Sequence, residues 1–163
     1  MTTHPSDERE HKIVVGVDGS IPSKSALTWA ITQARLTGAT VEAVIAWEFP
    51  VSYGYPVPVA PNVNFEETAA EVLASVIAEV ADPDEPVTIR SKVVEGNAAR
   101  VLLDESAGAD LLVVGSRGHG GFTEALIGSV GQHCVHHASC PVVVIRDSVT
   151  SGFSGDSVPA ARR

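Results

Sequence analysis

Hydrophobic positions along the chain follow two patterns, one typical of buried strands and the other of the helices that cover them. Five short apolar runs predict strands at residues 13–17, 41–47, 87–94, 111–114 and 142–145. Nearly continuous valine-rich runs of this kind suit a parallel sheet that is buried on both faces. Apolar residues with helical spacing occupy the intervals, so strands and helices are expected to alternate along the chain.

Four helices are predicted in these intervals, and capping residues mark the ends of two of them. Ser20 is a suitable N-cap for the first helix, Pro22 fits its first turn, and Gly38 is expected to end it. Asn97 is likewise a suitable cap for a short third helix, which Gly108 is expected to end. The other two helices are expected at residues 65–80 and from 129 to about 137.

The alternation of strand and helix predicts an α/β domain with parallel strands and right-handed crossovers. At 163 residues the chain suits one domain, expected at residues 11–146 between flexible tails at 1–10 and 147–163. Residues 48–64 fall outside the pattern. They contain four prolines and are expected to form a long irregular loop.

Charge and composition narrow the expected partners. The formal net charge of −9 argues against nucleic acid or an anionic membrane surface as the main partner. Residues 1–11 lack the apolar segment of a secretory signal, and the apolar runs are too short to cross a bilayer. A cytoplasmic protein is therefore expected, with Cys134 and Cys140 reduced and partly buried.

A glycine-rich segment follows the predicted strand 111–114. It reads Gly115-Ser116-Arg117-Gly118-His119-Gly120-Gly121, and Gly128-Ser129-Val130 then opens the last predicted helix. Glycine allows close approach of the backbone, and a helix N-terminus favours anions. The segment therefore predicts a phosphate site built from main-chain amides. Neither the Walker A pattern nor the dinucleotide-binding glycine spacing is present.

The spacing of these glycines resembles the signature of the universal stress protein family, and more narrowly of its ATP-binding branch. The signature is glycine, two residues, glycine, nine residues and Gly-Ser, which Gly115, Gly118 and Gly128-Ser129 match. Residues 13–20 and 140–145 match the first and last strands of the family, so the resemblance covers roughly residues 11–146. It implies a Rossmann-like fold similar to the adenine nucleotide alpha hydrolases, with an open five-stranded parallel sheet of order 3-2-1-4-5 and helices on both faces. Ligands of such sheets bind where the winding reverses, beside strands one and four.

The resemblance also implies which residues contact the nucleotide. The amides of residues 115–121, Ser129 and Val130 are expected to hold the phosphates of ATP, with a further contact from the Ser129 hydroxyl. Asp18 is expected to bind the ribose or to help hold a Mg²⁺ ion carried by the nucleotide. Ala46 and Val94 match positions that flank adenine. The expected nucleotide-binding residues are Gly16, Val17, Asp18, Ala46, Val94, Gly115, Ser116, Arg117, Gly118, His119, Gly120, Gly121, Gly128, Ser129 and Val130.

Some side chains allow two interpretations. Arg117 either supplies a cation near the γ-phosphate or is a solvated loop residue. A surface position suits His119 better than a phosphate contact through its side chain. His133 and His137 have the i,i+4 spacing of a metal chelate, but a solvated face at a helix C-terminus is the preferred interpretation.

The function implied by the resemblance is that of a cytoplasmic, ATP-dependent stress sensor or regulator. ATP is expected to order the 115–128 loop and the region of Tyr53 and thereby alter a surface that an unidentified regulatory protein recognises. Family members commonly dimerise through the last strand, so a homodimer through residues 142–145 is expected. The alternative is a slow ATPase or a nucleotidyl-transfer enzyme on the same fold. The sequence indicates no general base or arginine pair for such chemistry.

Overall fold

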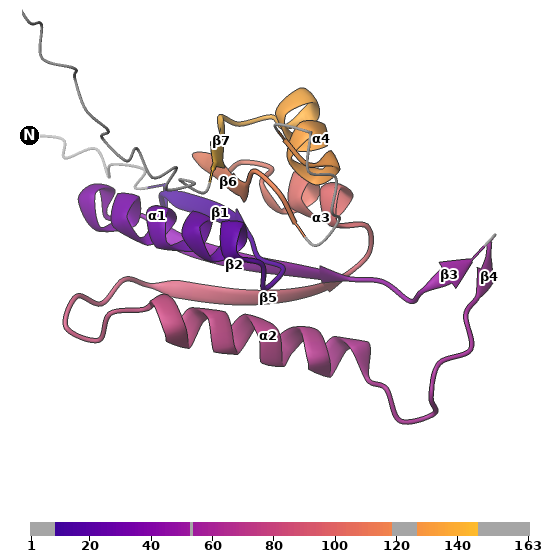
Figure 1. Ribbon diagram of the computed structural model, residues 1–163. Coiled ribbons are helices and arrows are strands. Elements are labelled where there is room, and N and C mark those ends of the chain that lie inside the picture. The colour runs from indigo at the N-terminus through magenta and orange to yellow at the C-terminus, as the bar shows by residue number, and fades with distance from the viewer. Residues whose placement is uncertain (1–8, 53, 119–126, 147–163) are drawn as a thin grey trace, which may run out of the picture.

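A computed structural model describes residues 9–52, 54–118 and 127–146 of the chain (Figure 1). Five parallel strands form the main sheet, in the order β5-β2-β1-β6-β7. Their bounds are β1 Lys12–Gly16, β2 Thr40–Trp47, β5 Ile89–Glu95, β6 Leu111–Gly115 and β7 Val142–Ile145. Counted along the chain within this sheet alone, the strands lie in the order 3-2-1-4-5. The predicted α/β class is therefore confirmed, and β1 and β6 lie side by side where the winding reverses.

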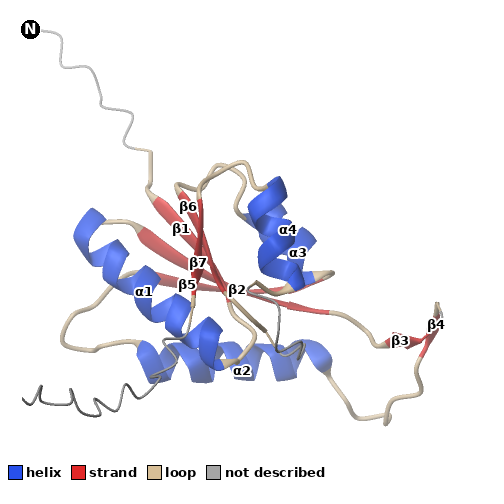
Figure 2. Ribbon diagram, turned by 45° about the horizontal axis from the view of Figure 1, so that its top comes forward, coloured by secondary structure: helices blue, strands red, loops and turns tan. Residues whose placement is uncertain are grey.

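Helices cover both faces of the sheet (Figure 2). The helices α1 (Ile21–Thr37) and α2 (Phe65–Val80) pack on one face, and α3 (Ala98–Glu105) and α4 (Ser129–His137) pack on the other. Neighbouring side chains of β1 pack on alternate faces of the sheet, because successive side chains of a strand point to opposite sides. Val15 belongs to the core under α1 and α2, whereas Val14 belongs to the core under α3 and α4; both are fully buried.

Local signals place the ends of α1 correctly. The Ser20 hydroxyl accepts a hydrogen bond from the Ser23 backbone N–H at 3.4 Å and so caps the helix. Gly38 ends it in the left-handed conformation, with φ at 72°, and its N–H donates to the Ala34 carbonyl at 2.8 Å. A residue with a side chain rarely adopts this φ, which explains the glycine.

The predicted end of the third helix is wrong. Asn97 does cap α3, since its side chain accepts from the Arg100 N–H at 3.3 Å. The helix however ends at Glu105, with Ser106 as its C-cap, before it reaches Gly108. Gly108 lies in the following turn, where its φ of 74° supplies the left-handed residue between helix and strand.

Strand bounds also shift, because a strand extends only as far as its neighbour pairs with it. The prediction of a strand at 87–94 is corrected to Ile89–Glu95, which pairs residue for residue with 41–47 of β2. Likewise β1 covers Lys12–Gly16 rather than 13–17, in register with 40–44 of β2. The apolar run identifies the strand, and the partner strand fixes its ends.

The expectation of an irregular loop at 48–64 is only partly met. Two short strands, β3 (Val51–Ser52) and β4 (Tyr55–Pro56), pair antiparallel as a hairpin, and the Val57 N–H donates to the Pro50 carbonyl at 3.0 Å. Figure 1 shows this hairpin projecting beyond the end of the main sheet. Among the described residues, no helix has the length and apolar character needed to span a bilayer.

Candidate functional site

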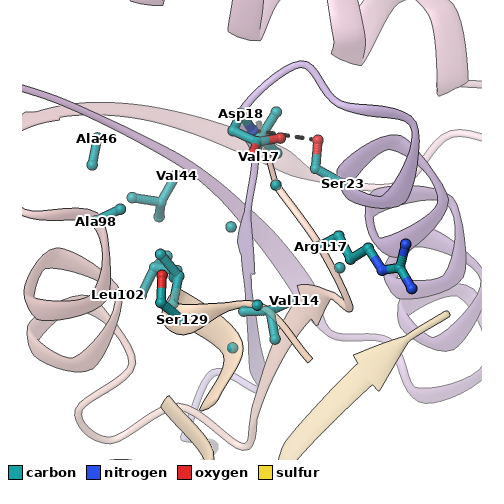
Figure 3. Close-up of a pocket in the computed structure, with 16 residues that line it drawn as sticks. Val17, Asp18, Ser23, Val44, Ala46, Ala98, Leu102, Val114, Arg117 and Ser129 are labelled. Atoms are coloured by element: carbon teal, nitrogen blue, oxygen red, sulfur yellow. Dashed lines mark hydrogen bonds between the residues drawn. The ribbon is translucent and has the colours of Figure 1, made fainter. Parts of the chain in front are cut away.

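A cavity of about 180 Å³ opens at the carboxyl ends of β1 and β6 (Figure 3). Its walls come from the turn between β1 and α1, from β2 and α3, and from the segment between β6 and α4. The lining residues are Gly16, Val17, Asp18, Ser23, Val44, Ala46, Ala98, Leu102, Val114, Gly115, Arg117, Gly118, Gly128, Ser129, Val130 and Gly131.

The turn after β1 holds the Asp18 carboxylate in a fixed orientation. One carboxylate oxygen, Oδ1, accepts from the Ser20 backbone N–H at 2.9 Å and also from the Ser20 hydroxyl. The Asp18 N–H donates to the Ser23 hydroxyl at 3.3 Å, which ties the turn to the first turn of α1. These bonds fix the side chain locally, as in an Asx turn.

Glycines let three segments of the chain meet at this point. A Cβ atom at Gly118 would lie 2.6 Å from the other Asp18 oxygen, Oδ2. A Cβ at Gly16 would lie 2.7 Å from Leu102 Cδ1 of α3. Both separations are shorter than real contacts between such atoms, so the absence of a side chain is what allows the close approach. The turn after β1 and the loop after β6 therefore meet across bare backbone.

The N-terminus of α4 faces the same cavity. Its N-cap is Gly128, which has no side chain to bond the first amides of the helix. The Gly128 N–H donates to the Ser116 carbonyl at 2.6 Å, which anchors the helix start against the loop after β6. Ser129 and Val130 form the first turn and line the cavity. A helix start of this kind carries partial positive charge and favours an anion.

The cavity has one apolar side and one polar side. Val44, Ala46 and Leu102 supply apolar surface, whereas the glycine segment and the start of α4 supply backbone groups. Among the described residues that line it, Asp18 and Arg117 carry charge. Arg117 is exposed, and in Figure 3 its guanidinium points away from the other labelled side chains. This arrangement suits a ligand that joins an apolar ring to an anionic group.

Ten of the residues expected from the sequence line this cavity. Asp18 and Gly118, which lie 100 positions apart in the chain, are brought together as expected. Two others are placed differently. The Ser116 amide donates to the Ile145 carbonyl of β7 at 2.7 Å, so the expectation that it holds a phosphate is wrong. Val94 does not line the cavity, because β5 is separated from the β1–β6 junction by β2.

The remaining expected residues, His119, Gly120 and Gly121, lie outside the described part of the chain, as does Tyr53. Six lining residues were not expected from the sequence: Ser23, Val44, Ala98, Leu102, Val114 and Gly131. For α3 a signal was available. Ala98 and Leu102 have i,i+4 spacing and follow the carboxyl end of a strand, which is the edge where the cavity opens.

The histidines and cysteines of α4 and the following turn lie apart from the cavity lining. His133 and His137 are exposed, with ring centroids 4.5 Å apart. Within the described ranges, no group of three or more His, Cys, Asp or Glu side chains is arranged to hold a metal ion. Cys134 and Cys140 are free thiols, and burial raises the pKa of Cys134 to about 11.

Comparison with known proteins identifies the family. The model of the universal stress protein family matches residues 10–146. The chain belongs to this family. The universal stress protein Rv2005c of Mycobacterium tuberculosis (strain ATCC 25618 / H37Rv) is 36% identical over 147 residues, which cover 87% of this chain and 48% of that protein. The chain therefore spans about half the length of the curated relatives it matches.

Solved structures of universal stress proteins share the fold. One is a universal stress protein in complex with cAMP, with 24% identity, a TM-score of 0.56 and coverage of 85% of this chain and 98% of that chain. Another is the protein from Archaeoglobus fulgidus in complex with dAMP, with 22% identity, a TM-score of 0.59 and coverage of 83% and 97%. At these identities the likeness concerns the fold.

Proposed function

We propose that this universal stress protein binds ATP in the cavity between β1 and β6 and acts as a nucleotide-dependent sensor or regulator. The observation that carries the proposal is the bare-backbone junction of Asp18, Gly118 and the start of α4. A side chain at position 118 would collide with Asp18 of the same chain, so this position has room only for glycine. Its backbone groups and helix terminus are the features by which proteins hold phosphate without a basic patch.

The two sides of the cavity match the two parts of a nucleotide. The amides of Gly118, Ser129 and Val130 are the candidate phosphate donors. Val44, Ala46 and Leu102 offer the apolar surface against which a purine packs. Related structures in complex with cAMP and dAMP support the choice of an adenine ring.

The residues present also fit a Mg²⁺ ion carried by the nucleotide. Magnesium is usually bound by one or two carboxylates together with substrate phosphates and water. Asp18 is the carboxylate that lines the cavity, and Ser20 already orients it. Bound Mg²⁺ would neutralise the repulsion between this carboxylate and the phosphates.

A bound nucleotide could regulate the protein because it would contact several segments of the chain at once. The turn after β1, the loop after β6 and α4 all reach the cavity, so a bound nucleotide links elements that are distant in sequence. At a ligand concentration 100 times the Kd, binding stabilises the folded state by about 2.7 kcal/mol. A regulatory protein would recognise the surface that is ordered in this way. In this proposal two copies pair through β7, which lies at the edge of the sheet.

The test is the substitution Gly118→Val, measured by calorimetric titration with Mg-ATP. We expect the affinity to fall by about 100-fold or more, because the new side chain occupies space next to Asp18 Oδ2. Stability should fall less than for a substitution that meets backbone, since the contacted atom belongs to a side chain, which can shift if it gives up its bonds to Ser20. Ala74→Val, at an exposed position of α2 on the opposite face of the sheet, is the matched control.

Unchanged affinity in Gly118→Val would contradict the proposed site. An assay of ADP release by the wild-type protein separates the sensor from the slow ATPase that the sequence left as the alternative. The sensor is expected to release ADP no faster than Gly118→Val, whereas a slow ATPase would release ADP at a rate that this substitution lowers.

A further inference from the structure

The segment that contains the projecting hairpin carries most of the exposed large hydrophobic side chains of the described residues. We call residues 48–64 the arm. Six of the nine such side chains lie in the arm: Phe49, Val51, Tyr55, Val57, Val59 and Val63, with exposed fractions between 38% and 76%. Figures 1 and 2 show β3 and β4 extending beyond the sheet, so the body of the same chain does not cover them. Clustered apolar exposure of this kind marks an interaction surface.

A groove of about 460 Å³ lies at the base of the arm. Its lining residues are Trp47, Phe49, Pro61, Asn62, Val63, Asn64, Phe65 and Glu66. The rings of Trp47 and Phe49 pack edge to face at a centroid distance of 5.2 Å, and those of Phe49 and Phe65 do so at 5.6 Å. These contacts hold the rings against one another, so the groove has a preformed aromatic wall, beside which Asn62, Asn64 and Glu66 supply polar groups.

The charge of the arm indicates which partner fits. Residues 49–65 contain no Lys, Arg, Asp or Glu, whereas the whole chain carries a formal charge of −9. Two copies of the chain repel each other over much of their surface. Residues 49–65 can meet a second copy without burying a charge of their own, and Glu66, which also lines the groove, is exposed. A second copy also brings both parts of the contact, an apolar tip and an apolar groove.

We propose that two copies associate about a two-fold axis, each placing Tyr55 at the tip of its arm in the groove of the other. Tyr55 is 76% exposed and follows the turn formed by Gly54. In a two-fold arrangement the tip and the groove are each used twice, and the contact closes on itself. Growth by strand addition is unfavourable, because Pro56 lies in β4 and has no N–H to donate.

The contact is small for a specific interface. Two arms expose apolar surface on the order of 1,000 Å² in total, which lies at the low end for specific interfaces. A weak dimer is expected, with a Kd of roughly 1–100 μM. This proposal goes beyond nucleotide binding and does not depend on it.

The test is sedimentation velocity of the full chain over a range of concentrations, with the substitution Tyr55→Glu. The wild-type protein is expected to associate as concentration rises. The substitution should weaken that association by about tenfold or more, because it places a carboxylate in an apolar groove. Leu36→Glu is the matched control, since Leu36 is also 76% exposed but lies on α1. If copies also pair through β7, wild type should form a tetramer through the arms, and Tyr55→Glu should leave only the dimer that is paired through β7.

A mixing experiment shows whether tip and groove belong to different copies. Val63→Lys alters the groove and should weaken association on its own. An equimolar mixture of Tyr55→Glu and Val63→Lys should associate more strongly than either variant alone, because the new carboxylate then meets the new ammonium group. The proposal is overturned if wild type stays monomeric, if Tyr55→Glu associates like Leu36→Glu, or if mixing restores nothing.

Discussion

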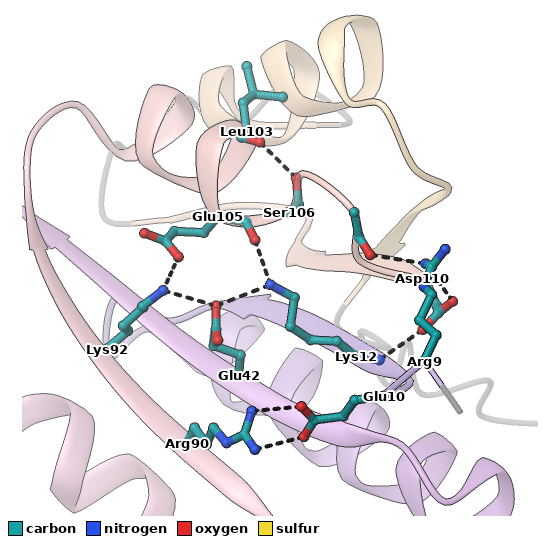
Figure 4. A network of polar contacts seen from close by, with 11 residues as sticks. Arg9, Glu10, Lys12, Glu42, Arg90, Lys92, Leu103, Glu105, Ser106 and Asp110 are labelled. Carbon is teal, nitrogen blue, oxygen red and sulfur yellow. Dashed lines mark hydrogen bonds and ion pairs between the residues drawn. The ribbon is translucent and has the colours of Figure 1, made fainter. Parts of the chain in front are cut away.

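At the carboxyl ends of the strands a cavity is lined largely by glycines and short side chains (Figure 3), whereas at the amino ends charged side chains pair with one another (Figure 4). Glu42 of β2 is buried there, with its Oε1 atom 3.7 Å from Lys12 Nζ and 3.6 Å from Lys92 Nζ. Lys92 also pairs with Glu105 at the end of α3, and this hydrogen bond raises the pKa of Lys92. The amino end is thus held together by its own side chains.

The contrast between the two ends of the strands suggests that one end stabilises the fold and the other binds a ligand. Where side chains pair with one another, as around Glu42, little remains for a ligand to contact. Where side chains are missing, as at Gly118 and Gly128, backbone groups line a cavity. We therefore expect substitutions at the amino end to change the free energy of unfolding and leave nucleotide affinity unchanged. Substitutions at the carboxyl end should do the reverse, with one exception.

The exception is Gly115, where the largest effect is expected. A Cβ atom there would lie 2.7 Å from the backbone carbon of Pro22 and 2.9 Å from its carbonyl oxygen. Backbone atoms at the start of α1 cannot rotate away, so Gly115→Val should lower the free energy of unfolding by about 3 kcal/mol. Urea denaturation measures this cost, and Gly118→Ala, which meets only the end of a side chain, is the control. Equal costs in both variants would contradict the distinction between rigid and movable contacts.

A smaller effect is expected for Glu42→Ala at the amino end. Removing one partner of a buried ion pair costs ~3–5 kcal/mol when both partners are buried. Lys12 and Lys92 keep 25% and 46% of their side chains exposed, so we expect about 2 kcal/mol. Nucleotide affinity should stay within about twofold of wild type, because Glu42 does not line the cavity.

The control for this substitution is Arg100→Ala. It removes an exposed pair with Asp104 on α3 and should cost no more than about 0.5 kcal/mol. A loss of nucleotide affinity in Glu42→Ala comparable to that in Gly118→Val would show that the two ends are coupled, and the separation drawn above would fail.

Local features of the fold were predictable from the residues themselves, whereas the meeting of distant segments was predicted only where the family resemblance supplied it, as for Asp18 and Gly118. Ser20 and Gly38 act on their own helix, so their roles follow from residue type and position. The contact between Gly16 and Leu102 joins residues 86 positions apart. The spacing of Ala98 and Leu102 indicates one face of α3 but not the segment that this face meets. For this reason the glycine loop was identified from its motif, while the wall of the cavity formed by α3 was missed.

The two corrections at the site have the same origin. Ser116 belongs to the glycine motif by sequence, yet its amide extends the pairing with β7 by one residue. Val94 was placed by resemblance, yet it packs against the core under α3 and α4. It lies on β5, and β2 and β1 stand between β5 and β6. Whether an amide is free to bind a ligand, and whether a side chain faces the cavity, depends on which strands pair. The sequence pattern of one strand does not show which strand lies beside it.

The smallest expected effect comes from Asp110, at the amino ends of the strands. It should make the free energy of unfolding depend on pH in the acidic range. The Lys12 backbone N–H donates to Asp110 Oδ2 at 2.8 Å, which lowers the pKa of this carboxyl, and Arg9 lies 3.1 Å from Oδ1. A lowered pKa stabilises the folded protein at pH values above the unfolded pKa of about 3.9, and that contribution is lost as the pH falls through the folded value. Asp110 is about one-third exposed, so Asp110→Asn should cost less than about 1 kcal/mol at pH 7. Urea denaturation of both proteins from pH 7 to pH 3 should show the difference shrinking toward acid, and a constant difference would mean that packing, not charge, accounts for it.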